Sequence, residues 1–185
     1  VLFMYDALNN FFLKKADLGF SSNGAEPNGR PCKAGNDKIY FVTANGGING
    51  AGTILEYNPV TNQYIKRADM SDIGAYACYG GMSDGTNGKL YGISNKGGLN
   101  DEGLIYEFDY TNYSLTKIRD LGGLDGKWSY STLLKASNGK LYGTTQDGGI
   151  FGLGTLFEVD PLTNIFTKKI DFSNANGRRP SYELT

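Results

Sequence analysis

Apolar and polar residues alternate along residues 155–160 and again along 165–171, with the Pro-Leu-Thr-Asn turn signal between the two runs. This alternation is typical of β-strands that bury one face. Upstream, residues 131–136 and 140–145 predict two further strands. The Asn-Gly pair at 138–139 joins them and is a strong two-residue hairpin signal, because both positions tolerate positive φ. Four short strands with short links predict a β-meander.

The same pattern occurs three times along the chain at a step of 51 residues, as Tyr40, Tyr91 and Tyr142 show. Self-similarity at such a period indicates a repeat architecture whose units bury their apolar faces against one another. Residues that recur are expected to build the repeat, and residues that differ are candidates for function. The recurring positions include the glycine pairs Gly46-Gly47, Gly97-Gly98 and Gly148-Gly149, then Gly52, Gly103 and Gly154, and the acids Glu56, Glu107 and Glu158.

These meanders predict an all-β fold, a β-propeller of four-stranded antiparallel blades with about 3.5 blades in this chain. The N-terminal residues fit only the second half of a repeat, and the C-terminal residues fit only a first strand. The expected units are a partial blade at 1–17, blades at 27–69, 78–120 and 129–171, and the first strand of a next blade at 180–185.

A blade count this small suggests that the chain is part of a larger ring, since three or four blades are few for closure. The competing interpretation is a small assembly that oligomerisation completes. The mass of the intact natural polypeptide would separate the two.

Composition removes several functions. The net charge of −1 argues against nucleic acid as a partner. Histidine is absent, which removes the commonest general base and transition-metal ligand. No apolar run is long enough to span a membrane. Cys32 and Cys78 occupy different repeat positions, so two separate, partly buried thiols are favoured over a disulfide, which stays open.

The segments Asn138 to Thr145, Gly148-Gly149 and Gly154 to Asp160 resemble the GloVer tandem repeat of bacterial "choice-of-anchor" surface proteins. The resemblance covers nearly the whole chain, although Phe41-Val42-Thr43 departs from it. Blade length is also similar to kelch repeats, but the paired-glycine loop before the Leu-Phe-Glu strand fits GloVer better. The resemblance implies a secreted or surface-anchored bacterial protein, and it brings no established catalytic residues.

Two acidic positions recur in the repeats, one a glutamate and one an aspartate. Carboxylates could indicate catalysis or cation binding, but their repetition over separate blades favours structural roles. The third-strand glutamates are expected to pair with fourth-strand lysines, or with backbone, instead of forming an acid–base pair or cation site. Examples of such lysines are Lys66, Lys117 and Lys168. The aspartates at the strand ends are expected to cap turns or backbone, and they are Asp17, Asp69, Asp120 and Asp171.

The segment between each fourth strand and the next first strand varies between copies and combines aromatic faces with cations. In propeller topology these segments emerge on the same face as the glycine-rich loops. Such a surface suits stacking on sugar rings or holding an anionic partner, although the aromatics could instead fill contacts between blades. The predicted ligand-binding residues are Tyr76, Tyr79, Lys127, Trp128, Tyr130, Arg178, Arg179 and Tyr182, and Arg30 lies in the matching segment of the first copy.

The sequence therefore favours a non-enzymatic extracellular or cell-surface module for scaffolding or for recognition of a glycan or protein partner. No cofactor and no metal site are predicted, and the expected neighbours are other blades or subunits of a larger propeller. One alternative is a polysaccharide-acting propeller enzyme whose catalytic residues lie in blades outside this chain. Another is a purely structural spacer of an adhesin.

Overall fold

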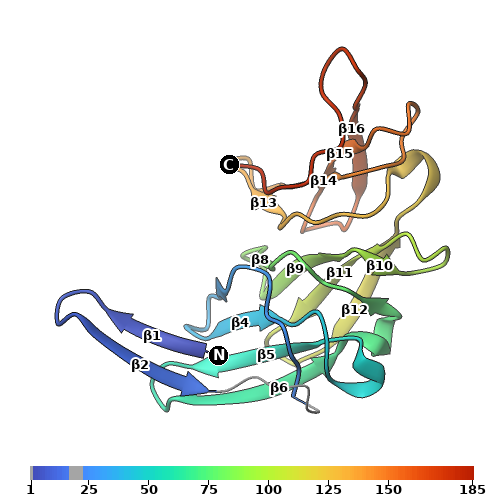
Figure 1. The fold of residues 1–185 in the computed structure, drawn as a ribbon. Coiled ribbons are helices and arrows are strands. Elements are labelled where there is room, and N and C mark those ends of the chain that lie inside the picture. Colours follow the sequence, from blue (N-terminus) through green and yellow to red (C-terminus); the bar gives the residue numbers. More distant parts are fainter. Residues whose placement is uncertain (1, 17–22) are drawn as a thin grey trace.

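Three four-stranded antiparallel sheets follow one another in the computed structural model, which describes residues 2–16 and 23–185 (Figure 1). Each sheet is a meander of consecutive strands, and we call the sheets blades 1, 2 and 3. Blade 1 comprises β3 (Cys32–Lys33), β4 (Ile39–Val42), β5 (Thr53–Asn58) and β6 (Gln63–Asp69). Blade 2 comprises β8 (Ser83–Asp84), β9 (Lys89–Ser94), β11 (Leu104–Asp109) and β12 (Leu115–Asp120). Blade 3 comprises β13 (Leu134–Lys135), β14 (Leu141–Thr145), β15 (Thr155–Val159) and β16 (Phe166–Asp171).

Smaller elements lie outside the blades. The strands β1 (Leu2–Asp6) and β2 (Phe11–Ala16) form a hairpin, and β7 (Ala75–Tyr76) pairs with β10 (Lys96–Gly97). Short 3₁₀ turns are η1 (Ile48–Gly50), η2 (Met70–Ile73) and η3 (Gly123–Asp125). The predicted all-β class with four-stranded antiparallel sheets is confirmed.

The core lies between neighbouring blades. Between blades 1 and 2, Tyr40, Ile54 and Phe108 belong to one buried cluster. Between blades 2 and 3, Ile105 and Phe157 belong to a second. Burial of such side chains contributes about 1.5–3 kcal/mol each relative to exposure, so blade-to-blade packing holds the array together.

The first strands are shorter than the sequence predicts. The expected strand at 131–136 is reduced to β13, and residues 180–185, expected as a first strand, form none. The backbone ladder stops early because these inner segments bond across blades: the Gly81 amide donates to Thr132 Oγ1 at 2.8 Å. Glu183 in the last segment likewise accepts from Thr132 Oγ1 at 2.5 Å.

The hairpin turn between the first two strands also differs from the expected two-residue form. Within the described residues, Gly139 has positive φ (79°) and Asn138 does not. The Gly139 amide donates to the Ala136 carbonyl at 3.0 Å, which gives a turn followed by one left-handed residue. The asparagine instead uses its side chain: Nδ2 donates to the Tyr142 hydroxyl at 2.9 Å, and the pairs Asn36–Tyr40 and Asn87–Tyr91 repeat this bond.

The β1–β2 hairpin has the register of a third and fourth strand. Its bulge lies between Leu2 and Phe3, and blade 2 has the matching bulge between Ile105 and Tyr106. Asp6 Oδ1 accepts the Leu8 amide at 2.9 Å, as the acid ending β11 accepts the amide two residues on. The hairpin therefore corresponds to half a blade.

Candidate functional site

The recurring aspartates at the ends of the fourth strands lock the glycine-rich loops, which confirms the capping prediction for three of the four. In blade 1, Asp69 Oδ1 accepts the Ile48 amide at 2.8 Å and Oδ2 binds Lys66 Nζ at 2.7 Å. Gly47 approaches so closely that a Cβ there would lie 2.5 Å from the same carboxylate, and its φ of 71° also favours glycine. Asp120 and Asp171 make the equivalent bonds, while Asp17 lies outside the described residues.

The recurring glutamates are paired, and Glu158 binds a fourth-strand lysine as predicted, Lys169, but none of the three named lysines, Lys66, Lys117 and Lys168, is a partner. Lys66 stands opposite Leu55 in the ladder, one residue away from Glu56, so the two side chains point to opposite faces. The bulged residue Arg67 reaches Glu56 instead, with Nε at 3.0 Å and Nη2 at 2.9 Å. The other glutamates bind Lys89 and Asn164 (Glu107) and Tyr142 and Lys169 (Glu158).

The pKa of Glu56 is lowered although burial alone would raise it, because the Arg67 and Tyr40 hydrogen bonds outweigh that desolvation. A carboxyl held ionised in this way is unsuited to deliver a proton near neutral pH. The arrangement therefore fits a structural ion pair between strands.

The two cysteines are separate thiols, as expected. Burial raises the pKa of Cys78 to about 12, and burial followed by the Asp84 charge raises the pKa of Cys32 to about 11. Thiols with such pKa values are weak nucleophiles at neutral pH.

The variable segments cross the glycine-rich loops of the blades that follow them. The pair β7–β10 and the single bridges Ala25–Asn45 and Lys127–Asp147 are the same contact in successive repeats. Directly after each of these three contacts the backbone becomes left-handed, and it is left-handed at the same repeat position in the C-terminal segment as well. The left-handed residues are Glu26 (φ 56°), Ala77 (53°), Trp128 (57°) and Arg179 (48°), each 51 residues after the previous one.

Trp128 is half-buried and lies between two lysines. Lys127 Nζ is 4.6 Å and Lys96 Nζ 4.9 Å from its ring centroid, within the range of a cation–π interaction. Lys127 also binds Glu102 Oε1 at 3.0 Å, and Lys96 binds Asp101 Oδ2 at 3.7 Å. The lysine charges are thus partly neutralised, and the tryptophan is fixed by its neighbours.

The structure brings several predicted residues together. Tyr79 and Tyr130 stack with ring centroids 5.5 Å apart and planes 11° apart, and both remain about two-fifths exposed. Tyr76 donates its hydroxyl to Asp101, which joins it to the cluster around Trp128. These residues come from the segments on both sides of blade 2.

The C-terminal group of predicted residues lies in the segment after blade 3. Arg179 Nε binds Asp147 Oδ1 at 3.1 Å, which attaches this segment to the blade 3 glycine loop. Tyr182 is 86% exposed, and Arg178 is exposed. Among the described residues, no hydrogen bond, ion pair or ring contact joins this group directly to Trp128, so the structure does not bring all eight predicted residues together.

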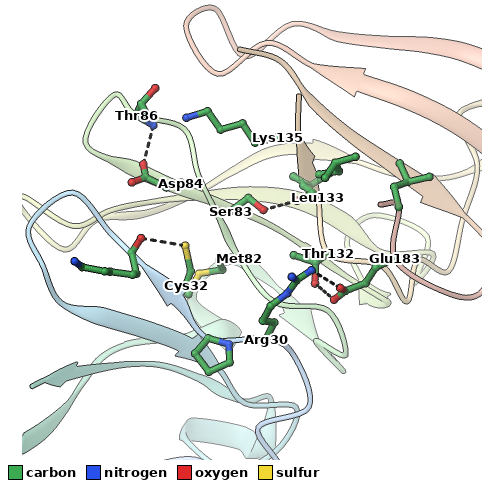
Figure 2. A pocket seen from close by; sticks show the side chains of 14 residues that line it. Arg30, Cys32, Met82, Ser83, Asp84, Thr86, Thr132, Leu133, Lys135 and Glu183 are labelled. Carbon is green, nitrogen blue, oxygen red and sulfur yellow. Dashed lines mark hydrogen bonds and ion pairs between the residues drawn. The ribbon is translucent and has the colours of Figure 1, made fainter. Parts of the chain in front are cut away.

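A cavity between the first strands was missed by the sequence reasoning (Figure 2). It has a volume of about 440 Å³ and is lined from all three blades and from the C-terminal segment. At one end Glu183 binds Arg30 Nη2 at 2.6 Å and Thr132 Oγ1 at 2.5 Å. One feature of the sequence could have pointed to this cavity. A single repeat position carries four different residues, Arg30, Gly81, Thr132 and Glu183.

Comparison with known proteins shows the family. The model of the Gloeobacter/Verrucomicrobia repeat matches residues 71–185, well over half of the chain. The chain belongs to this repeat family. No curated protein matches it, and among the described residues no helix is long and apolar enough to cross a membrane.

Among solved structures, the chain is similar to TolB from Acinetobacter baumannii, with a TM-score of 0.57 and 16% identity. The match covers 90% of this chain and 36% of the TolB chain, so this chain spans about a third of that protein's length. At this identity the likeness shows the fold alone. The predicted β-propeller architecture is therefore confirmed.

Proposed function

We propose that this chain is a non-enzymatic recognition module, extracellular or on the cell surface, that binds a protein or glycan partner through the face around Trp128. The observation that carries the proposal is the series of left-handed residues. Glu26, Ala77, Trp128 and Arg179 share one backbone conformation at one repeat position and differ completely in their side chains. A rigid frame that presents variable residues on loops is the usual arrangement in repeat proteins that bind partners.

The cluster around Trp128 supplies the chemistry for such binding. Its indole is held by Lys96 and Lys127, and the stacked Tyr79–Tyr130 pair leaves flat ring surface exposed nearby. Rigid aromatic side chains provide contact area at low entropic cost, and they are enriched where partners bind strongly. The face therefore suits a partner with flat apolar surfaces and anionic groups.

The test removes side chains without disturbing the backbone. Glycine adopts the left-handed conformation freely, so Trp128→Gly with Arg179→Gly adds no backbone strain, and circular dichroism would check that the variant is folded. Binding would be measured by surface plasmon resonance against uronic-acid oligosaccharides and acidic peptides, with Ala77→Gly as the matched control. We expect the double variant to lose binding of any probe that the unaltered chain and the control retain. Retained binding in the double variant, or no binding by the unaltered chain, would count against this face.

A further inference from the structure

The cavity between the first strands has an apolar wall. Pro31, Met82, Leu133 and Leu184 line it and occupy one repeat position in successive copies. Its volume of about 440 Å³ lies within the roughly 300–1,000 Å³ of small-molecule pockets. An apolar wall inside a cavity of this size suits a small ligand with an apolar body.

The end of the cavity at Glu183 offers no free charge among the described residues. Arg30 and Glu183 form an ion pair there, and the Thr132 hydroxyl donates a hydrogen bond to the other oxygen of the Glu183 carboxylate (Figure 2). A charged group of a ligand would therefore gain little at this end, because each charge already has a partner.

The other end carries two opposite charges that do not pair. Asp84 on β8 and Lys135 on β13 occupy the same repeat position in neighbouring blades and line the same cavity (Figure 2). Neither forms an ion pair with any residue that the structure describes, whereas Lys33 at this position in blade 1 binds Asp37. In the part of the chain that the structure describes, the one hydrogen bond to the Asp84 carboxylate comes from the Thr86 amide, at 2.7 Å. The Asp84 carboxylate and the Lys135 ammonium thus remain available to a ligand at this end of the cavity.

We propose that this cavity binds a free, zwitterionic α-amino acid with an apolar side chain. The ligand ammonium binds the Asp84 carboxylate, the ligand carboxylate binds Lys135 Nζ, and the side chain lies along the apolar wall, where Leu134 is only half-buried. A zwitterion fits better than a simple anion because it satisfies both unpaired charges. This site is separate from the face around Trp128, so either proposal can fail alone.

The experiment uses ligands that each lack one charge. Isothermal titration calorimetry would compare L-leucine with N-acetyl-L-leucine, which lacks the ammonium, and L-leucine amide, which lacks the carboxylate. A pH of about 6 keeps the amine protonated and the carboxylate ionised. The variants Asp84→Asn and Lys135→Gln remove one protein charge each, and Asp72→Asn, an exposed change outside the cavity, is the control.

The proposal predicts a crossed pattern. Asp84→Asn should weaken leucine and leucine amide by about tenfold, the size of one charge-assisted bond, and leave N-acetyl-leucine unchanged. Lys135→Gln should weaken leucine and N-acetyl-leucine and leave leucine amide unchanged. Absence of saturable leucine binding to the unaltered chain would overturn the proposal, and so would equal weakening of all three ligands by both variants.

Cys32 gives an independent check of location, because it lines the cavity while Cys78 is fully buried. Bound leucine should slow alkylation of Cys32, measured by mass spectrometry at mildly alkaline pH. An alkylation rate unaffected by saturating leucine would place the ligand elsewhere and overturn the proposal.

Discussion

Blade 2 and the β1–β2 hairpin have the same strand register and opposite burial. Phe108 on β11 is fully buried, whereas Tyr5, its counterpart on β1, is 57% exposed. Blade 2 has a neighbour on each face, and its buried side chains belong to the clusters shared with blades 1 and 3 (Figure 1). Among the described residues, none covers the Tyr5 ring of the hairpin in the same way. The apolar pattern thus determines which side chains can be buried, and neighbouring blades determine whether they are.

The largest expected effect is in the core. Phe108→Ala should lower the free energy of unfolding by about 3–5 kcal/mol, because it removes a fully buried ring and leaves a cavity. Tyr5→Ala, at the corresponding position, should change it by less than about 0.5 kcal/mol. Urea unfolding followed by tryptophan fluorescence would measure both. Similar losses at the two positions would contradict the comparison.

The position of the recurring glutamates gives a second comparison between a complete blade and the hairpin. Arg67→Gln leaves the buried Glu56 carboxylate without its ion-pair partner and should cost about 2–3 kcal/mol. The hairpin carries Met4 at this position, and Met4→Glu should cost little because the site is open to water. Urea midpoints of the two variants test this. A large loss from Met4→Glu would show that the hairpin face is covered.

The aspartates that hold the glycine-rich loops should make a contribution to folding stability that is lost in acid. Burial would raise the pKa of Asp171, but the Ile150 amide and Lys168 outweigh it, so the pKa is lowered. A carboxyl whose pKa is lower in the folded state stabilises the fold above its unfolded pKa, about 3.9, and loses that contribution as pH falls through the lower folded value. Stability measured between about pH 6 and 2 should therefore decline at the acid end. Asp171→Asn should flatten this decline, and an unchanged decline would argue against the lock.

The smallest expected effect concerns the left-handed positions. Ala77→Gly should stabilise the chain by up to about 1 kcal/mol, because it relieves the strain of alanine at φ 53°. Differential scanning calorimetry would show a small rise in Tm. A fall would mean that the alanine methyl group contributes packing that exceeds the strain.

The sequence predicts the blade framework well, because its signals are local. Alternation along β15 and the acid at the end of β16 follow from nearby residues. The named lysine partners of the glutamates were wrong because a bulge, not visible in the sequence, turns Arg67 toward Glu56. The cavity between the first strands was not predicted because it forms only when residues as far apart in the sequence as Arg30 and Glu183 come into contact.

Native-state hydrogen exchange tests most directly whether neighbouring blades, more than the apolar pattern, stabilise each sheet. Amides of β11, flanked by two blades, should exchange only with near-global unfolding. Amides of β1, with the same pattern and an exposed face, should exchange by local opening at far lower free energy. Equal protection of β1 and β11 would contradict this, because the hairpin would then be as stable as a complete blade.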